Sequence, residues 1–152
     1  MAAEHRTAAR LAAVQALYQM DVTGKGLNEI YAEFETFWIG CEIEGDQYRP
    51  AEITFFRAIL AGVIEDQLGI DQLVDTTLQE GWKLPRVDTI MRAILRAGTY
   101  ELKSRKDVPA RVVITEYADV GAAFLVREEV GMINAVLDNL ARRLRPGEFE
   151  GR

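Results

Sequence analysis

Several residue types on which enzymes depend are scarce in this chain of 152 residues. It contains one serine (Ser104), one histidine (His5) and one cysteine (Cys41). A Ser-His-Asp triad would have to join His5 to Ser104, and no nucleophile elbow surrounds that serine. A zinc site needs three or four His, Cys or carboxylate ligands, and a lone cysteine cannot form an internal disulfide. These scarcities argue against nucleophilic catalysis and zinc chemistry, and they fit a reducing compartment.

Other common signatures are missing as well. The segment Gly24-Lys25-Gly26 has neither the spacing of a phosphate-binding loop nor that of a dinucleotide fingerprint. No apolar run approaches the roughly eighteen residues of a membrane span, and no apolar signal region follows the N-terminus. Adjacent acids such as Glu65-Asp66 and Glu128-Glu129 point to diverging helix faces, which favours solvated surface over a carboxylate-only hydrolase. We therefore expect a cytoplasmic protein that is not an enzyme and uses no cofactor or metal.

Apolar residues recur at spacings of three and four almost from end to end, which is typical of amphipathic helices. Strand and hairpin signals are nearly absent. Residues 40–51 lose the period and predict an exposed loop, and residues 145–152 predict a loose tail. The pattern predicts an all-α fold of seven helices, at about 5–23, 27–39, 52–67, 70–80, 86–105, 109–124 and 130–144.

A break at 81–85 separates four of these helices from the other three. The predicted organisation is a single domain over 1–152, made of an N-terminal bundle at about 5–80 and a C-terminal bundle at about 82–145. The charges follow the same division. Residues 1–80 hold 5 Lys and Arg against 14 Asp and Glu, whereas residues 81–152 hold 13 against 10. A net charge of −6 does not exclude RNA binding, because at physiological salt the local field decides.

Arg6 and Arg10 are four residues apart at the start of the first helix, so they share a face where free backbone amides also favour anions. This spacing fits a phosphate-binding patch or an ordinary solvated face. A second group, Trp82, Lys83 and Arg86, could stack on and neutralise a nucleotide, or Trp82 could close the joint between the bundles.

Two further groups have equally simple alternatives. Arg142, Arg143 and Arg145 lie at the end of the last helix, where cations complement the helix dipole. Phe124 ends one helix and Met132 lies at the start of the next. They could flank one groove as contacts for a base or a partner, or they could belong to the core.

Several short stretches follow one another in a characteristic order. They are Arg6-Thr-Ala-Ala-Arg10, Ala13-Val-Gln-Ala-Leu-Tyr18, Phe56-Arg-Ala-Ile-Leu-Ala-Gly62, Ile94-Leu-Arg-Ala-Gly-Thr-Tyr-Glu-Leu102, Val108-Pro109, Ile114-Thr-Glu116 and Ile133-Asn-Ala-Val-Leu-Asp138. In their order and separation these stretches resemble the NusB family, and the resemblance runs from about residue 5 to 145. The resemblance implies a seven-helix fold of two bundles. It also implies a transcription antitermination factor that binds single-stranded boxA RNA of ribosomal RNA leaders together with NusE, a small-subunit ribosomal protein. That pair would join an antitermination complex on RNA polymerase, with no cofactor and no membrane.

The resemblance also implies where the sites lie. The expected RNA-binding residues are Arg6, Arg10, Gln15, Tyr18, Lys83, Phe124, Glu128 and Met132. The expected contacts with the NusE partner are Arg86, Ile90 and Met91. Met132 replaces the family's usual aromatic residue, which would exchange a stacking contact for a thioether contact. A protein-binding helical adaptor, an accessory RNA-binding module of a ribosomal RNA methyltransferase, and a homodimer remain alternatives for role and assembly.

Overall fold

The computed structural model describes residues 2–37, 49–78 and 87–149, and within them the chain forms helices and no strand. The helices are α1 (Ala2–Thr23), α2 (Leu27–Phe37), α3 (Arg49–Glu65), α4 (Gln67–Thr77), α5 (Thr89–Ser104), α6 (Ala110–Phe124), α7 (Arg127–Leu144) and a short 3-10 helix, η3 (Pro146–Phe149). The predicted all-α class and its seven α-helices are confirmed.

Several helix starts, among them those of α3 and α7, differ from the expected boundaries by three residues. Helix α3 begins at Arg49, inside the expected loop, and Pro50 falls in its first turn, where a missing N–H costs no hydrogen bond. Helix α7 begins at Arg127 rather than near 130. The Val126 backbone N–H donates to the Glu129 carboxylate at 3.2 Å, which satisfies a free amide just before the first turn. The rest of the expected loop, 40–48, lies outside the described residues.

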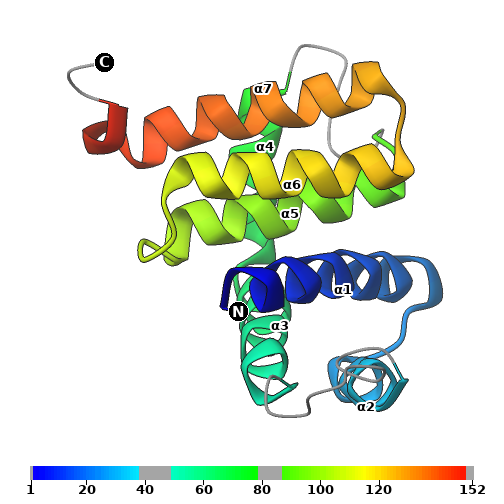
Figure 1. The fold of residues 1–152 in the computed structure, drawn as a ribbon. Helices are drawn as coiled ribbons and strands as arrows, with labels where there is room; N and C mark the ends of the chain where they lie inside the picture. The colour runs from blue at the N-terminus through cyan, green and yellow to red at the C-terminus, as the bar shows by residue number, and fades with distance from the viewer. Residues whose placement is uncertain (1, 38–48, 79–86, 150–152) are drawn as a thin grey trace.

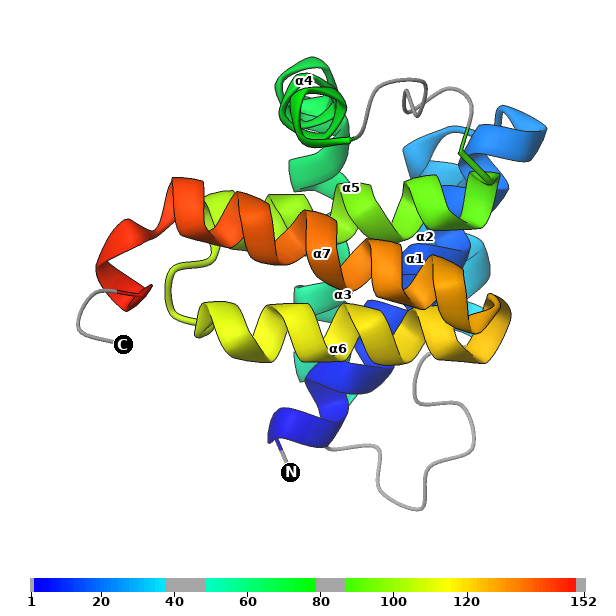
Figure 2. The same cartoon turned by 90° about the horizontal axis from the view of Figure 1, so that it is seen from above.

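The C-terminal helices α5, α6 and α7 each pack against the other two, and α6 runs antiparallel to both α5 and α7, as Figure 1 shows. Helix α1 packs on α3 and α5 and also contacts α6, while α2 lies against α1 and α3. Helix α4 crosses α5 and α7 on the other side of the bundle (Figure 2). Helices from both halves of the sequence therefore meet on α5. The predicted division at 81–85 falls outside the described residues and stays a prediction.

Helix α5 is covered on both faces. Its apolar residues, including Met91, Ile94 and Leu95, are buried in the core. Its polar face carries cations that pair with acids of the N-terminal half, namely Arg92 with Asp21 at 2.8 Å, Arg96 with Asp71 at 2.8 Å, and Lys103 with Asp66 at 2.5 Å. Part of the excess of acidic residues in 1–80 is therefore explained by the fold, because these residues form ion pairs with the cations of α5.

One glycine allows α3 and α5 to approach closely. A Cβ atom on Gly62 would lie 2.0 Å from Cε1 of Tyr100, a distance at which one of the helices would have to move. Both residues belong to stretches that carry the family resemblance. A second glycine, Gly24, has φ +77 and ends α1, with its N–H donating to the Met20 carbonyl at 2.9 Å.

The prediction of a loose tail over residues 145–152 is wrong for its first residue. Arg145 is buried, and its guanidinium donates to the carbonyls of Glu101 at 2.8 Å, Leu102 at 2.9 Å and Arg105 at 2.8 Å, as well as to that of Val108. It therefore caps the end of α5, whereas the sequence suggested that it only complements its own helix. The following residues form η3.

The chain shows no membrane-spanning candidate in its described part, because none of those helices combines the necessary length with an apolar enough sequence.

Candidate nucleic-acid interface

Arg10 lies in a buried ion-pair network between α1, α5 and α6. Its Nε and Nη2 atoms donate to the two carboxylate oxygens of Glu101 at 2.8 and 3.0 Å, and its Nη1 donates to Glu116 at 2.9 Å. The Tyr117 hydroxyl also donates to Glu101, and Thr7 donates to Glu116 at 2.6 Å. Both Arg10 and Glu101 are buried, at 2% and 0% exposure. The charges are therefore paired and hydrogen-bonded, as buried charges must be.

The network also shifts the pKa values of Arg10 and Tyr117. Burial alone would lower the pKa of Arg10, but the hydrogen bonds and the charge of Glu101 raise it above its ordinary value. Burial raises the pKa of Tyr117 well above its ordinary value, and the neighbouring Glu101 carboxylate raises it further. Both shifts favour the Arg10 cation and the neutral Tyr117 hydroxyl.

This geometry corrects the expectation that Arg10 contacts RNA. Its guanidinium is held by Glu101 and Glu116 beneath α5 and α6, so a phosphate group cannot reach it. Arg6 is different, because its side chain is 37% exposed and its Nη2 lies 3.4 Å from Asp107 Oδ2. The two arginines share a helix face, as expected, but the neighbouring helices cover only the second of them.

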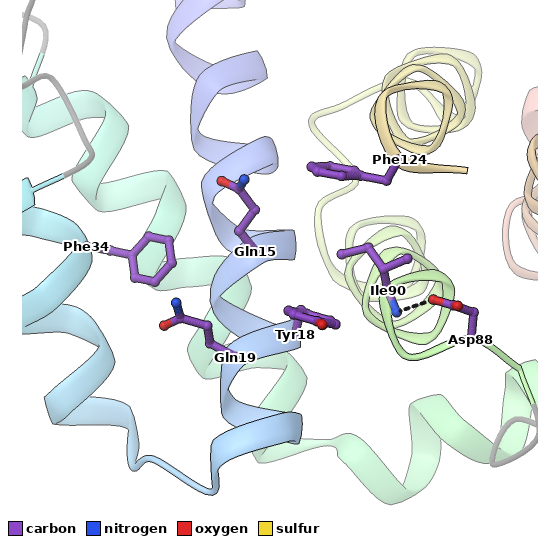
Figure 3. Close-up of a pocket in the computed structure, with 7 residues that line it drawn as sticks. All are labelled: Gln15, Tyr18, Gln19, Phe34, Asp88, Ile90 and Phe124. Atoms are coloured by element: carbon purple, nitrogen blue, oxygen red, sulfur yellow. Dashed lines mark hydrogen bonds between the residues drawn. The ribbon is translucent and has the colours of Figure 1, made fainter. Parts of the chain in front are cut away.

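A pocket opens at the other end of α1, where α5 begins and α6 ends. Its volume is about 420 Å³, enough for a small organic group. We call it the aromatic pocket. Its lining side chains, drawn in Figure 3, are Gln15, Tyr18, Gln19, Phe34, Asp88, Ile90 and Phe124. Three expected RNA contacts (Gln15, Tyr18 and Phe124) and one expected partner contact (Ile90) are therefore brought together, although α6 and α1 are far apart in sequence.

The pocket has an apolar side and an amide side. In Figure 3, Tyr18 projects toward Ile90 and Phe124, whereas Gln19 lies on the side of α1 that faces Phe34. Tyr18 and Phe124 are 39% and 43% exposed, so part of each ring is accessible to a ligand in the pocket. Asp88 caps α5 by accepting from the Ile90 N–H at 2.9 Å, and its carboxylate stays at the rim. Such a site can stack a planar ring and offer hydrogen bonds to its edge.

Gln19 adds an unsatisfied group to this pocket. Its Oε1 is buried and has no hydrogen-bond partner in the described structure, which is unusual for a buried polar atom. Sequence reasoning did not single out Gln19, Phe34 or Asp88. The signal for Gln19 was its spacing of four from Gln15, which places both amides on neighbouring turns of α1.

Other expected contacts lie elsewhere. Glu128 and Met132 line a separate groove of about 430 Å³ between α4 and α7, with residues such as Leu78 and Asn139. Met91 is 1% exposed, so the expectation that it contacts a partner directly is wrong, because it faces the core while its neighbour Ile90 faces the pocket. Lys83 and Arg86 lie outside the described residues. Among the described residues, no group of three or more His, Cys, Asp or Glu side chains could hold a metal ion.

The chain is thus a small helical protein whose N-terminal helix carries a buried ion-pair network near one end and an aromatic pocket near the other. Residues 7–142 match the model of the NusB family. The chain belongs to the NusB family.

Two relatives in sequence are transcription antitermination proteins named NusB. The protein from Nitrobacter hamburgensis is 62% identical over 147 residues, which cover 97% of this chain and 92% of that protein. The protein from Rhodopseudomonas palustris strain CGA009 is also 62% identical over 147 residues, covering 97% of this chain and 84% of that protein.

Solved structures share the fold. The structure of NusB from T. maritima is 28% identical with a TM-score of 0.79, covering 95% of this chain and 96% of that one. A crystal structure of antitermination factors NusB and NusE in complex with dsRNA gives a TM-score of 0.74 at 22% identity, covering 92% of this chain and 98% of that one. At that identity the likeness concerns the fold.

Proposed function

We propose that this protein is a transcription antitermination factor that binds boxA RNA of ribosomal RNA leaders together with NusE, as part of an antitermination complex on RNA polymerase. The observation that carries the proposal is the aromatic pocket. It unites the expected RNA contacts Gln15, Tyr18 and Phe124 with the expected partner contact Ile90. A bound RNA and a bound protein would therefore meet at one end of α1, and each could stabilise the other.

The comparisons support the same proposal. The relatives at 62% identity carry the name of transcription antitermination proteins. The structural neighbour that contains NusE and double-stranded RNA has the same fold, and we propose the same two kinds of partner for this chain. Single-stranded boxA remains our expectation for this chain, and a duplex belongs in the test.

In the proposed mode of binding, an unpaired base enters the aromatic pocket between Tyr18 and Phe124. Stacking on aromatic side chains is tolerant of sequence, so discrimination between bases would come from hydrogen bonds to the base edge. The amides of Gln15 and Gln19 offer both donors and acceptors for that purpose, and the Asp88 carboxylate offers acceptors. Arg10 does not contact the RNA in this arrangement. It holds α1 against α5 and α6, and so positions both walls of the pocket.

The proposal keeps the remaining expected contacts as predictions. Glu128 and Met132 would contact RNA or NusE only if the partner extends from the pocket over the start of α7 into the α4–α7 groove. Lys83 and Arg86 would contribute from the segment between α4 and α5.

The test is a titration of fluorescent boxA RNA with the protein, with and without NusE, alongside a scrambled RNA and a duplex of the same length. We expect selective binding to boxA that NusE tightens. The variant Phe124→Ala should weaken boxA binding by about 5- to 100-fold, since stacking on an aromatic ring contributes about 1–3 kcal/mol per base. Leu68→Ala is the matched control, because Leu68 is an exposed apolar residue (88%) on α4.

Equal and weak binding to all three RNAs in the presence of NusE would contradict the proposal and favour a protein-binding adaptor. Unchanged boxA affinity in Phe124→Ala would contradict the assignment of the pocket as the base site, even if the protein binds RNA.

A further inference from the structure

Three arginines surround a single aromatic ring where the start of α1 meets the connection between α5 and α6. Phe55 of α3 is buried, and the Cζ atoms of Arg6, Arg10 and Arg105 lie 4.8, 5.1 and 4.9 Å from its ring centroid. A ring face attracts guanidinium groups, so it can hold several like charges together that would otherwise repel one another. The ring therefore gathers cations from α1 and from the end of α5.

The three arginines meet three carboxylates, but these are unevenly distributed among them. Arg10 is already bound by Glu101 and Glu116. The other two guanidinium groups share one carboxylate, since Asp107 accepts from Arg105 Nε at 3.0 Å and lies 3.4 Å from Arg6 Nη2. The hydrogen bond from Arg105 is the main reason that the pKa of Asp107 is lowered to about 2. Lys106, next in sequence, is exposed and forms no ion pair within the described structure.

We propose that Arg6, Arg105 and Lys106 form a phosphate ledge, a binding site for phosphodiester groups of the RNA backbone. This inference rests on the proposed function. It adds Arg105 and Lys106, which are not among the RNA-binding residues expected from the sequence. Arg6 and Arg105 are already oriented by the Phe55 ring and by Asp107, so little side-chain freedom is lost when a phosphate binds. A guanidinium can then donate two parallel hydrogen bonds to phosphate oxygens.

The ledge and the aromatic pocket lie on the same helix. Arg6 and Tyr18 are separated by about 18 Å along α1 at the ordinary helical rise. A short single strand could therefore place its backbone on the ledge while an unstacked base enters the pocket. In this division of labour the ledge contributes affinity and register, and the pocket contributes selectivity.

The experiment measures RNA affinity at several salt concentrations for the wild type and for the double variant Arg6→Gln/Lys106→Gln, with boxA and scrambled RNA. Each lost phosphate contact should reduce the log–log salt slope by about 0.7 for single-stranded RNA, so two losses should reduce it by about 1.4. Because phosphate contacts carry no sequence information, the affinity for both RNAs should fall by the same factor, about tenfold at low salt. Thermal unfolding of the double variant checks that the fold is retained.

Arg111→Gln is the matched control. Arg111 is an exposed cation in the first turn of α6, but it lines a pocket with Glu148 and Phe149 on the η3 side. A second variant, Asp107→Asn, removes the shared counter-charge and should tighten binding about threefold at low salt. A merely structural role for these residues predicts no such gain.

An unchanged salt slope in a folded Arg6→Gln/Lys106→Gln protein would overturn the ledge, and so would an equal loss in Arg111→Gln, which would point to total charge alone. Failure of the proposed function has a different signature. The wild type would then bind boxA and scrambled RNA equally, while the ledge variants would still lower the salt slope.

Discussion

Along α1, the side chains of Thr7 and Arg10 end in contacts with α5 and α6, whereas those of Gln15, Tyr18 and Gln19 end in a pocket. At the first end, every strong polar group of the Arg10–Glu101 network meets a partner. At the second end, two large rings stay partly exposed, and a buried amide oxygen has no hydrogen-bond partner among the residues that the structure describes. The comparison suggests that polar groups satisfied inside the chain maintain the fold, while unsatisfied ones are available to a ligand.

The largest expected effect is at the first end. Arg10→Ala would leave the Glu101 carboxylate buried without its cation, and breaking a buried pair in this way costs about 3–5 kcal/mol. Urea unfolding of Arg10→Ala and of Arg6→Ala measures the difference. Arg6→Ala should lower the free energy of unfolding by less than about 1 kcal/mol, because Arg6 is exposed and surface ion pairs contribute little. Equal losses in the two variants would show that burial does not distinguish these arginines.

The next effect concerns the end of α5. Arg145→Ala would remove the donor for four backbone carbonyls and its contact with Glu148. Hydrogen bonds to charged groups contribute about 1.5–3 kcal/mol each in favourable cases, but water can replace some of these donors. We expect a loss of about 3 kcal/mol in the free energy of unfolding. The control is Arg142→Ala, which should cost far less. Arg142 is an exposed cation of α7 that, among the described residues, pairs with Asp138 and stacks on Phe149.

In the aromatic pocket, at the other end of α1, a substitution should increase the stability of the fold instead of lowering it. Gln19→Met keeps the size of the side chain and removes the unpartnered oxygen, so we expect the folded state to gain about 1 kcal/mol. The same change should weaken boxA binding, because a hydrogen-bonding group of the pocket is lost. Urea unfolding and RNA titration on one sample test both statements. A variant that is less stable than the wild type would show that the Gln19 amide is satisfied after all.

The smallest effect is a pH dependence at the ledge. The pKa of Asp107 is lowered from 3.8 to about 2, mainly by the hydrogen bond from Arg105. The ionised carboxylate therefore stabilises the folded state above pH 3.8, and this contribution is lost as the pH falls from 3.8 toward 2. Because Asp107 is half exposed, solvent screens the interaction and the effect should stay below about 1 kcal/mol. Thermal unfolding of wild type and Asp107→Asn should differ less at pH 2 than at pH 5, and a constant difference would contradict the assignment.

The helical fold was predictable because every helix buries one face, and a buried face imposes a period of three and four on the sequence. Helix ends were less predictable. The start of α7 depends on the Glu129 side chain returning to the Val126 amide, and the end of α5 depends on Arg145, some forty residues away. The local sequence pattern gives a weak indication of the contact between Glu129 and Val126, which are three residues apart. It gives no indication of the contact between Arg145 and the end of α5.

The candidate site shows the same limit. The spacing of Arg6 and Arg10 correctly placed them on one face, but spacing cannot tell what covers a face, and Glu101 and Glu116 come from distant helices. Met91 and Ile90 are adjacent in sequence, yet one faces the core and the other the pocket. Gln19 escaped notice because a glutamine in a helix is ordinary until the absence of its partner is seen.

The capping of α5 by Arg145 also bears on the order in which the chain folds during synthesis. The acceptors lie in α5 and in the turn that follows, but the guanidinium comes from a residue some forty positions later in the sequence. A nascent chain can form α5 early, because helix formation is local and fast. It cannot cap the carboxyl end of that helix until α6 and α7 have been synthesised. The α5–α6 turn, and with it the geometry of Arg105, is therefore completed only after both of those helices.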